Sequence, residues 1–269
     1  MAFTHLDLHA NTASELLRQL GALNISMPYE MPKGERETGY REKYSMAHFL
    51  AALAQHAQCE FPVQTVHNRH SHKKQPDFLY TFAGKTVGIE CTTATPHEWQ
   101  EIKNHRNILQ QQLAEAAEVT EEEFSGDPIV IFPPMFKAGA KTLSKEAMTR
   151  VATGEAQGSP WVGMMPRRQW AEAIAHFIEK KTILLRNGHY LEPMENWLLI
   201  QDEWPVPVYS LDERLEAAKL CLERIPTLLE PPAFSHIFIC DSSWLIRLHP
   251  GPIQSWAIPN LWNTGQTNW

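Results

Sequence analysis

The residues best suited to chemistry are two acids, Asp77 and Glu90, which stand thirteen positions apart. Each lies at one end of an apolar run, Phe78–Phe82 or Thr86–Ile89, and a short connection that contains glycine separates the two runs. This pattern predicts a β-hairpin, in which the start of the first strand lies beside the end of the second. We therefore expect the two acids to be neighbours at one rim of a sheet, where a pair of carboxylates suits a hard divalent cation.

Each acid also has an ordinary structural interpretation. Asp77 follows Pro76, a pair that is typical of turns, and Glu90 suits the solvated end of a strand. A third acid, Glu42, lies four positions before Met46 in an apolar stripe at helical spacing. It either interacts with the start of that helix as a capping charge or faces inward as an additional site residue.

The elements around the hairpin must hold these acids in place. Apolar residues at helical spacing, with capping and breaking residues at the ends, predict helices, and short β-branched or apolar runs predict strands. Helices are expected over residues 13–20, 40–58, 97–118, 144–153, 166–181 and 211–224, and further strands over 61–66, 129–132, 196–201, 236–240 and 244–248. This order predicts an α/β fold with a mixed β-sheet flanked by helices.

Composition and charge narrow the class of protein. The chain has 269 residues, of which 43% are hydrophobic and 20% charged, as in an ordinary globular protein. No apolar run reaches the length of about 20 residues that spans a membrane, and the N-terminus does not resemble a signal peptide. Because the four cysteines are also scattered, we expect a cytoplasmic protein without a membrane partner. A net charge of −7 argues against a surface coated for nucleic acid, although a nuclease needs only one basic face.

The most concentrated basic stretch, residues 67–74, comes immediately before the strand of Asp77. The candidates for contacts with nucleic-acid phosphates are Arg69, Lys73 and Lys74. Three histidines in this stretch have the spacing His-x2-His-x-His, which would also suit zinc, but no fourth ligand is evident. A basic turn that only faces solvent is the third alternative.

The same residues resemble the motif of the PD-(D/E)XK nuclease superfamily. The match consists of Pro76-Asp77 and of the segment Gly88-Ile89-Glu90-Cys91-Thr92, set between a preceding helix and a following helix and strand. The resemblance implies a restriction-endonuclease-like fold and metal-dependent hydrolysis of DNA or RNA phosphodiester bonds, with DNA favoured, by an endonuclease or an exonuclease. It implies that Asp77 and Glu90 bind Mg²⁺ or Mn²⁺, with the Cys91 backbone carbonyl and Glu42 as further ligands. It also implies a place in a prokaryotic restriction or defence system.

The departure from the family's pattern is Thr92, which stands where a lysine is usual. The lysine orients the nucleophilic water and offsets negative charge, whereas a threonine hydroxyl can form a hydrogen bond but carries no charge. The resemblance therefore implies a catalytic role for Thr92 or for a cation from elsewhere, first of all Lys103 in the expected helix 97–118. Lys103 also suits the solvated side of that helix, and Glu98 and Glu101 beside it would instead add to the carboxylates.

Three functions stay open at this point. The first is the Mg²⁺- or Mn²⁺-dependent nuclease, and the second is a nuclease fold that binds nucleic acid or serves as a scaffold without hydrolysis. The third is an α/β protein in which Asp77 and Glu90 are unrelated surface acids. We expect residues 1–39 to form a helix and an irregular connection, 40–250 the nuclease-like domain with a lid or insertion near 133–165, and 251–269 a tail packed on the domain. A homodimer or a partner protein is compatible with the first two functions.

Overall fold

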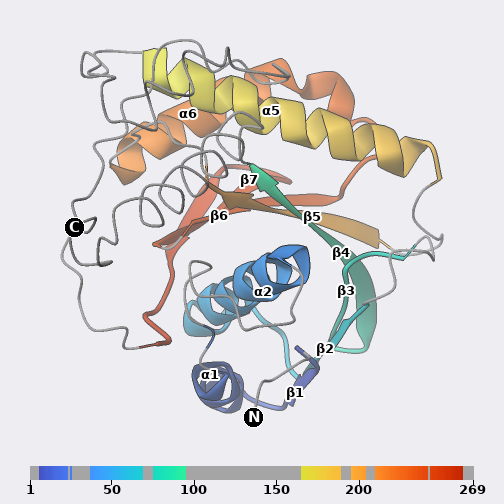
Figure 1. Ribbon diagram of the computed structural model, residues 1–269, viewed down its shortest axis with the longest axis vertical. Helices are drawn as coiled ribbons and strands as arrows, with labels where there is room; N and C mark the ends of the chain where they lie inside the picture. The colour runs from blue at the N-terminus through green and yellow to red at the C-terminus, as the bar shows by residue number, and fades with distance from the viewer. Residues whose placement is uncertain are drawn as a thin grey trace, which may run out of the picture.

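The computed structural model describes residues 6–23, 25, 37–68, 75–94, 165–188, 195–203, 210–241 and 243–262. These residues form one mixed β-sheet of eight strands with helices on both faces (Figure 1). The strands are β1 (Leu8–Ala10), β2 (Val63–His67), β3 (Phe78–Phe82), β4 (Lys85–Ala94), β5 (Glu195–Asp202), β6 (His236–Cys240), β7 (Trp244–His249) and β8 (Gln254–Ala257). The helices are α1 (Ala13–Ala22), α2 (Glu37–Gln55), α5 (Met165–Arg186), α6 (Leu211–Arg224) and the short 3-10 helix η2 (Pro226–Leu229).

The strands follow one another across the sheet in the order of the sequence. Strands β1 to β4 are antiparallel neighbours, as are β6 to β8, whereas β4, β5 and β6 run parallel. Parallel neighbours need a long crossover connection, and α5 lies in the first crossover and α6 in the second. These two helices cover one face of the sheet, and α1 and α2 cover the other (Figure 1). The mixed α/β architecture predicted from the sequence is therefore confirmed.

Strand β5 shows how the sequence separates the two faces. Trp197 and Leu199 belong to the core with α1 and α2, whereas Leu198 and Ile200 belong to the core with α5 and α6. Successive side chains of a strand point to opposite faces, so a strand that is covered on both faces has an uninterrupted apolar run. The run WLLI therefore identifies β5 as a central strand, as predicted.

The β3–β4 hairpin forms where the sequence predicts it. Ala83 and Gly84 make a two-residue turn with φ of 44° and 79°, the left-handed conformation that suits the twist of hairpin strands. In the register of the hairpin, Phe78 lies opposite Ile89. The two acids lie one position beyond this pair, so they meet at the rim where β3 begins. Strand β4 itself continues to Ala94, so Glu90 is buried within that strand and does not lie at its solvated end, which corrects the ordinary interpretation of this acid.

The two edge strands are not predicted from the sequence. Strand β1 has three residues and β8 has four, which is too short for an alternating pattern to be evident. Helix α1 continues to Ala22, two residues beyond the expected end at residue 20, so Gly21 lies inside the helix. Trp262, in the expected tail, is buried, and its indole N–H donates to the Leu20 carbonyl at 3.2 Å.

Some expected elements lie outside the described residues. These are the helices over 97–118 and 144–153, the strand over 129–132, and the lid or insertion near 133–165, apart from Met165 at the start of α5. In the described part of the chain, no helix is long and apolar enough to cross a membrane.

Candidate functional site

Asp77 is held in place by the two strands beside it. Its Oδ2 accepts a hydrogen bond from the Cys91 N–H on β4 at 2.8 Å. Just beyond β2, the Asn68 N–H donates to the Asp77 carbonyl at 2.8 Å, and the Asn68 side-chain amide donates to the Pro76 carbonyl at 2.9 Å. Both the carboxylate and the backbone of Asp77 are therefore oriented before any ligand binds.

Gly88 lets Pro76 lie directly on β4. A Cβ atom at position 88 would lie 2.8 Å from the Pro76 Cγ and 2.9 Å from the Asn196 Oδ1, which is closer than side chains tolerate. The glycine is therefore needed for the close approach of the proline that precedes Asp77. This gives the glycine of the segment Gly88–Thr92 a role in positioning.

Lys181 reaches Glu90 from the crossover helix α5. Trp170, Ile174 and Ile178 form the buried stripe of α5, and Lys181 follows Ile178 by three positions, so it lies on the same inward side. Its Nζ is 2.6 Å from the Glu90 Oε1, and the side chains are 17% and 10% exposed, respectively. This ion pair is sheltered from solvent, and it places an ammonium group over the strand that carries Glu90 and Thr92.

Glu42 approaches the same rim from α2. Its Oε2 is 3.4 Å from the His67 Nε2 at the end of β2. The His67 ring stacks on Phe78, with ring centroids 4.4 Å apart and planes at 13°. The backbone N–H of His67 donates to the Asp7 Oδ1 at 2.9 Å. The His67 Nδ1 is buried and finds no hydrogen-bond partner among the described residues. We refer to Glu42, His67, Asp77, Glu90 and Lys181 as the acidic site.

The acidic site carries more negative than positive charge. Burial raises the pKa of Asp77 well above its usual value, and the carboxylates of Glu90 and Glu42 raise it further. The Cys91 N–H and Lys181 oppose this rise but do not cancel it. Burial disfavours the charged form of Lys181, yet the attraction of Glu90 and Asp77 leaves the Lys181 pKa above its ordinary value. Lys181 therefore stays protonated, whereas the nearby carboxyl group of Asp77 is difficult to ionise.

The acidic site supplies carboxylate oxygens, the kind of ligand that a hard divalent cation prefers. Within the described ranges, no group of three His, Cys, Asp or Glu side chains is arranged to hold a metal ion, so an all-protein cage is absent there. Mg²⁺ usually keeps several waters and binds through one or two carboxylates together with substrate phosphates. Such a cation would neutralise the excess negative charge around Asp77. That Asp77, Glu90 and Glu42 bind such a cation stays a prediction.

Two other predicted residues lie on β4 next to Glu90. The Cys91 side chain is buried in the core with α1 and α2, and burial raises the pKa of its thiol well above the usual value, which disfavours a reactive thiolate. Its backbone carbonyl as a metal ligand stays a prediction. Thr92 is partly buried and, by the alternation of the strand, points to the same face as Glu90 and α5.

The remaining predicted residues lie outside the described part of the chain. These are Lys103, the phosphate-contact candidates Arg69, Lys73 and Lys74, the acids Glu98 and Glu101, and the histidines His70 and His72. Their roles stay predictions. Sequence reasoning missed Lys181, although its spacing from Ile174 and Ile178 places it on the buried stripe of an expected helix. A lysine on such a stripe is the signal that would have found it.

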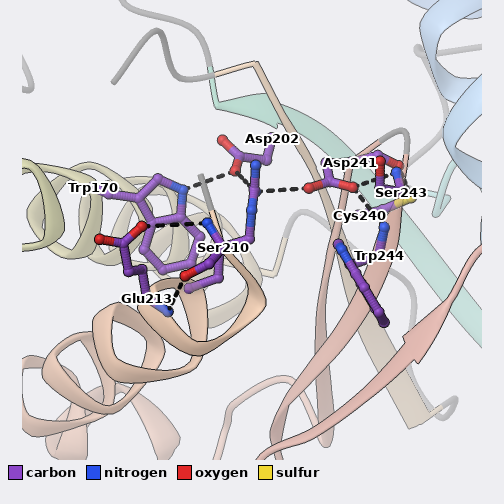
Figure 2. A network of polar contacts seen from close by, with 9 residues as sticks. Trp170, Asp202, Ser210, Glu213, Cys240, Asp241, Ser243 and Trp244 are labelled. Carbon is purple, nitrogen blue, oxygen red and sulfur yellow. Dashed lines mark hydrogen bonds and ion pairs between the residues drawn. The ribbon is translucent and has the colours of Figure 1, made fainter. Parts of the chain in front are cut away.

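A second buried polar cluster lies at the carboxyl ends of β5 and β6. Arg214 on α6 contacts the Asp202 Oδ2 at 3.0 Å and the Asp241 Oδ2 at 2.7 Å. The Trp170 indole N–H also donates to the Asp202 Oδ2, at 2.8 Å, and the Asp241 Oδ1 accepts the backbone N–H groups of residues 243 and 244 (Figure 2). We refer to Trp170, Asp202, Arg214 and Asp241 as the Arg214 cluster. Its carboxylates are satisfied by donors on several sides.

Comparisons with known proteins identify no relative of this chain. No protein-family model, no curated protein and no solved structure matches it.

Proposed function

We propose that the protein is a metal-dependent nuclease with a restriction-endonuclease-like fold, which hydrolyses phosphodiester bonds of DNA or RNA, with DNA favoured. The observation that carries this proposal is the buried contact between Lys181 and Glu90, at 2.6 Å, near Asp77, whose pKa is raised by burial and by its acidic neighbours. In the resemblance to the PD-(D/E)XK superfamily, the missing element is the lysine two positions after Glu90. Lys181 supplies a charge of the same kind from another element.

The order of elements around the acidic site supports the same proposal. Helix α2, the β3–β4 hairpin, the crossover helix α5 and the parallel strands β5 and β6 follow in the order that the resemblance implies. Each contributes to one rim: α2 supplies Glu42, the hairpin supplies Asp77 and Glu90, and α5 supplies Lys181. Four side chains from separate parts of the chain thus converge around the hairpin.

The chemistry follows from the charges. A bound Mg²⁺ or Mn²⁺ lowers the pKa of water and stabilises the charge that develops on the phosphate. Asp77 and Glu90 would hold the cation through their carboxylates, and Glu42 would add negative charge that favours binding. Because the pKa of Lys181 is raised rather than lowered, its ammonium group keeps its proton. Lys181 therefore orients water and stabilises negative charge by donating hydrogen bonds, and does not act as the base.

The residues that flank the basic stretch lie next to the acidic site. Asn68 is bonded to the carbonyl groups of Pro76 and Asp77, so the described residues that flank positions 69–74 lie beside the acidic site. Arg69, Lys73 and Lys74 are proposed to contact phosphates there, which would compensate locally for the net charge of −7.

A cleavage assay with matched variants tests the proposal. The protein is incubated with single-stranded and double-stranded DNA and RNA in the presence of Mg²⁺, Mn²⁺ or a chelator. We expect Asp77→Asn and Glu90→Gln to abolish cleavage, and Lys181→Met to reduce it about 10²–10³-fold, as for the loss of one electrostatic donor. The control is Lys180→Met, because Lys180 is the exposed neighbour on the same helix and should be silent.

The assay also separates the alternative functions. Cleavage that is unchanged in all three site variants would exclude the acidic site as the catalytic centre. Binding of DNA and metal without cleavage in the parent protein would identify a non-hydrolytic nucleic-acid-binding module. If the parent protein neither binds nor cleaves nucleic acid, the nuclease proposal is wrong.

A further inference from the structure

A cavity of about 580 Å³ lies between α2 and the segment that follows β8, away from the acidic site. This volume is within the range of about 300–1,000 Å³ that is usual for small-molecule sites. The lining residues that could contact a ligand through rings or polar atoms are Tyr44, His48, Ser243, Trp244, Asn260 and Trp262. None of the described residues that line the cavity carries a formally charged side chain at neutral pH, so the cavity favours an uncharged group.

His48 presents a hydrogen-bond acceptor at this cavity. Its Nδ1 is 3.0 Å from the Tyr44 carbonyl, and because a carbonyl can only accept, Nδ1 must carry the proton. Burial lowers the pKa of His48 to about 4, so the ring is neutral at pH 7 and Nε2 keeps a lone pair. Among the described residues, His48 has no hydrogen bond besides the one at Nδ1. A ligand in the cavity that carries an N–H or O–H donor can therefore bond to Nε2.

The aromatic walls of the cavity are already in place. The rings of His48 and Trp262 meet edge to face, with centroids 5.1 Å apart and planes at 89°. Trp262 is fixed by its bond to the Leu20 carbonyl, and the backbone of Trp244 is fixed by the Asp241 carboxylate (Figure 2). The ordered pair of His48 and Trp262, together with the Trp244 indole in the lining, favours a flat aromatic ligand that stacks or packs edge to face.

We propose that this cavity binds a nucleobase, with an exocyclic amine or ring N–H of the base donating to the His48 Nε2. Every base has such a donor and a π-face, and the Asn260 amide can complete the contact because it both donates and accepts. The uncharged lining selects the base rather than its phosphate. The base comes either from a free nucleoside or from an unstacked position in a single strand. This inference stands independently of the proposed hydrolysis at the acidic site.

Binding is tested by titrating the full-length protein and following tryptophan fluorescence, because Trp244 and Trp262 line the cavity, with calorimetry as confirmation. The ligands are the four common nucleosides and short single-stranded oligonucleotides. We expect saturable binding that is at least tenfold weaker in His48→Phe and partly restored in His48→Gln, which keeps an acceptor oxygen. The matched control is His9→Gln, since His9 is exposed on the short edge strand β1.

A pair of ligands tests the hydrogen bond itself. Adenosine has an N–H donor on its exocyclic amine, and N6,N6-dimethyladenosine has none. The parent protein should bind the dimethyl form at least tenfold more weakly than adenosine, whereas His48→Phe should bind the two ligands equally. Binding of free nucleosides assigns the site to a separate base, and His48-dependent binding of oligonucleotides alone assigns it to a base within a strand. Equal binding by the parent and His48→Phe, or no binding of either ligand class, overturns the proposal. Either result leaves the cleavage assay unaffected.

Discussion

The acidic site and the Arg214 cluster are both buried ion-pair groups, yet they are balanced in opposite ways. In the Arg214 cluster one guanidinium is shared by two aspartates, and the Trp170 indole and two backbone N–H groups complete the shells of the carboxylates. In the acidic site the ammonium group of Lys181 pairs with Glu90, and the pKa of Asp77 is raised because burial and the carboxylates of Glu90 and Glu42 disfavour its ionised form. The protein itself compensates the charges of the Arg214 cluster, but it does not fully compensate those of the acidic site.

The difference indicates where the protein is built for stability and where it is built for a ligand. A buried charge needs a partner and hydrogen bonds, and a cluster that supplies both is self-sufficient. A cluster of carboxylates with too few donors is destabilising unless an external cation binds it. Sites with strongly shifted pKa values and a specific charged partner are the usual candidates for function. On this reasoning the two groups should respond differently to the same kind of substitution.

The largest contrast is expected between Asp77→Asn and Asp202→Asn. Asparagine at position 77 keeps an oxygen for the Cys91 N–H and removes a carboxylate that burial and two neighbouring acids disfavour. We expect cleavage to fall more than about 10³-fold, which corresponds to more than about 4 kcal/mol, while the metal-free protein becomes more stable at pH 7. Asp202→Asn should cost about 2 kcal/mol of stability and leave the cleavage rate of the folded protein unchanged.

The sign of this stability effect can be checked by pH. The folded pKa of Asp77 is raised, so between its unfolded value and that raised value the folded state binds more protons than the unfolded state. The carboxylate therefore lowers stability as the pH rises through this window. Thermal unfolding of the parent and Asp77→Asn across pH 4–8 with a chelator measures it. A less stable Asp77→Asn variant at pH 7 would contradict the unbalanced charge inferred for the acidic site.

The second contrast removes a cation from the Arg214 cluster. Arg214→Met leaves two buried carboxylates without their shared partner, and breaking a buried pair in this way usually costs about 3–5 kcal/mol. Arg224→Met is the control, because Arg224 pairs with Glu172 at the surface and such pairs contribute about 0–1 kcal/mol. Urea unfolding at pH 7 measures both. Equal losses in the two variants would show that burial does not distinguish these ion pairs.

The third prediction concerns His48, which is close enough to Asp241 of the Arg214 cluster to interact with it electrostatically. Burial lowers the pKa of His48 to about 4 from 6.5, although Asp241 opposes this change. Between these two pH values the folded state therefore binds fewer protons than the unfolded state. The contribution of neutral His48 to the free energy of unfolding is complete above pH 6.5 and is lost as the pH falls through 4. The loss amounts to about 3 kcal/mol by pH 4. Urea unfolding at pH 4–7 should show this extra slope in the parent protein and not in His48→Phe.

The same two regions show how far the sequence alone could lead. The hairpin was predictable because a short turn fixes the register of its strands, so Asp77 and Glu90 had to meet. The run WLLI and the helix 211–224 were predictable because their patterns are strong and local. Lys181 was not predicted, because the next helix expected after Glu90 in the sequence is the one that carries Lys103. The strand that a helix covers depends on the crossover connection and on side-chain packing. The distance along the chain reveals neither of these.

The Arg214 cluster was less predictable still. Asp202, Arg214 and Asp241 come from β5, α6 and the turn after β6, and none of them belongs to a recognisable motif. A carboxylate at the end of a strand has the same appearance in the sequence whether it is solvated or paired with a buried arginine. Only the packing of α6 on the sheet brings these residues together. The identity of a buried ion pair is therefore a tertiary property.

The smallest predicted effect on stability separates geometry from charge in the acidic site. Gly88→Ala changes no charge, but its Cβ would lie 2.8 Å from Pro76 and 2.9 Å from the Asn196 side chain, so the proline and Asp77 must move. Overpacking of this kind typically costs about 1–3 kcal/mol. Because a displaced Asp77 would no longer share its rim with Glu90, we expect a loss of cleavage larger than the loss of stability would explain.

Gly39→Ala is the control for this substitution. Gly39 lies in α2 with no atom within 4 Å of a built Cβ, so alanine there should stabilise the helix by about 0.5–1 kcal/mol and leave cleavage unchanged. The two variants are compared by urea unfolding and by the Mg²⁺ concentration that gives half-maximal cleavage. If Gly88→Ala loses stability but keeps the same Mg²⁺ requirement, Pro76 does not position Asp77 for a cation. If the requirement rises, the acidic site depends on the close contact of Pro76 with β4 as well as on its charges, a dependence that the Arg214 cluster does not share.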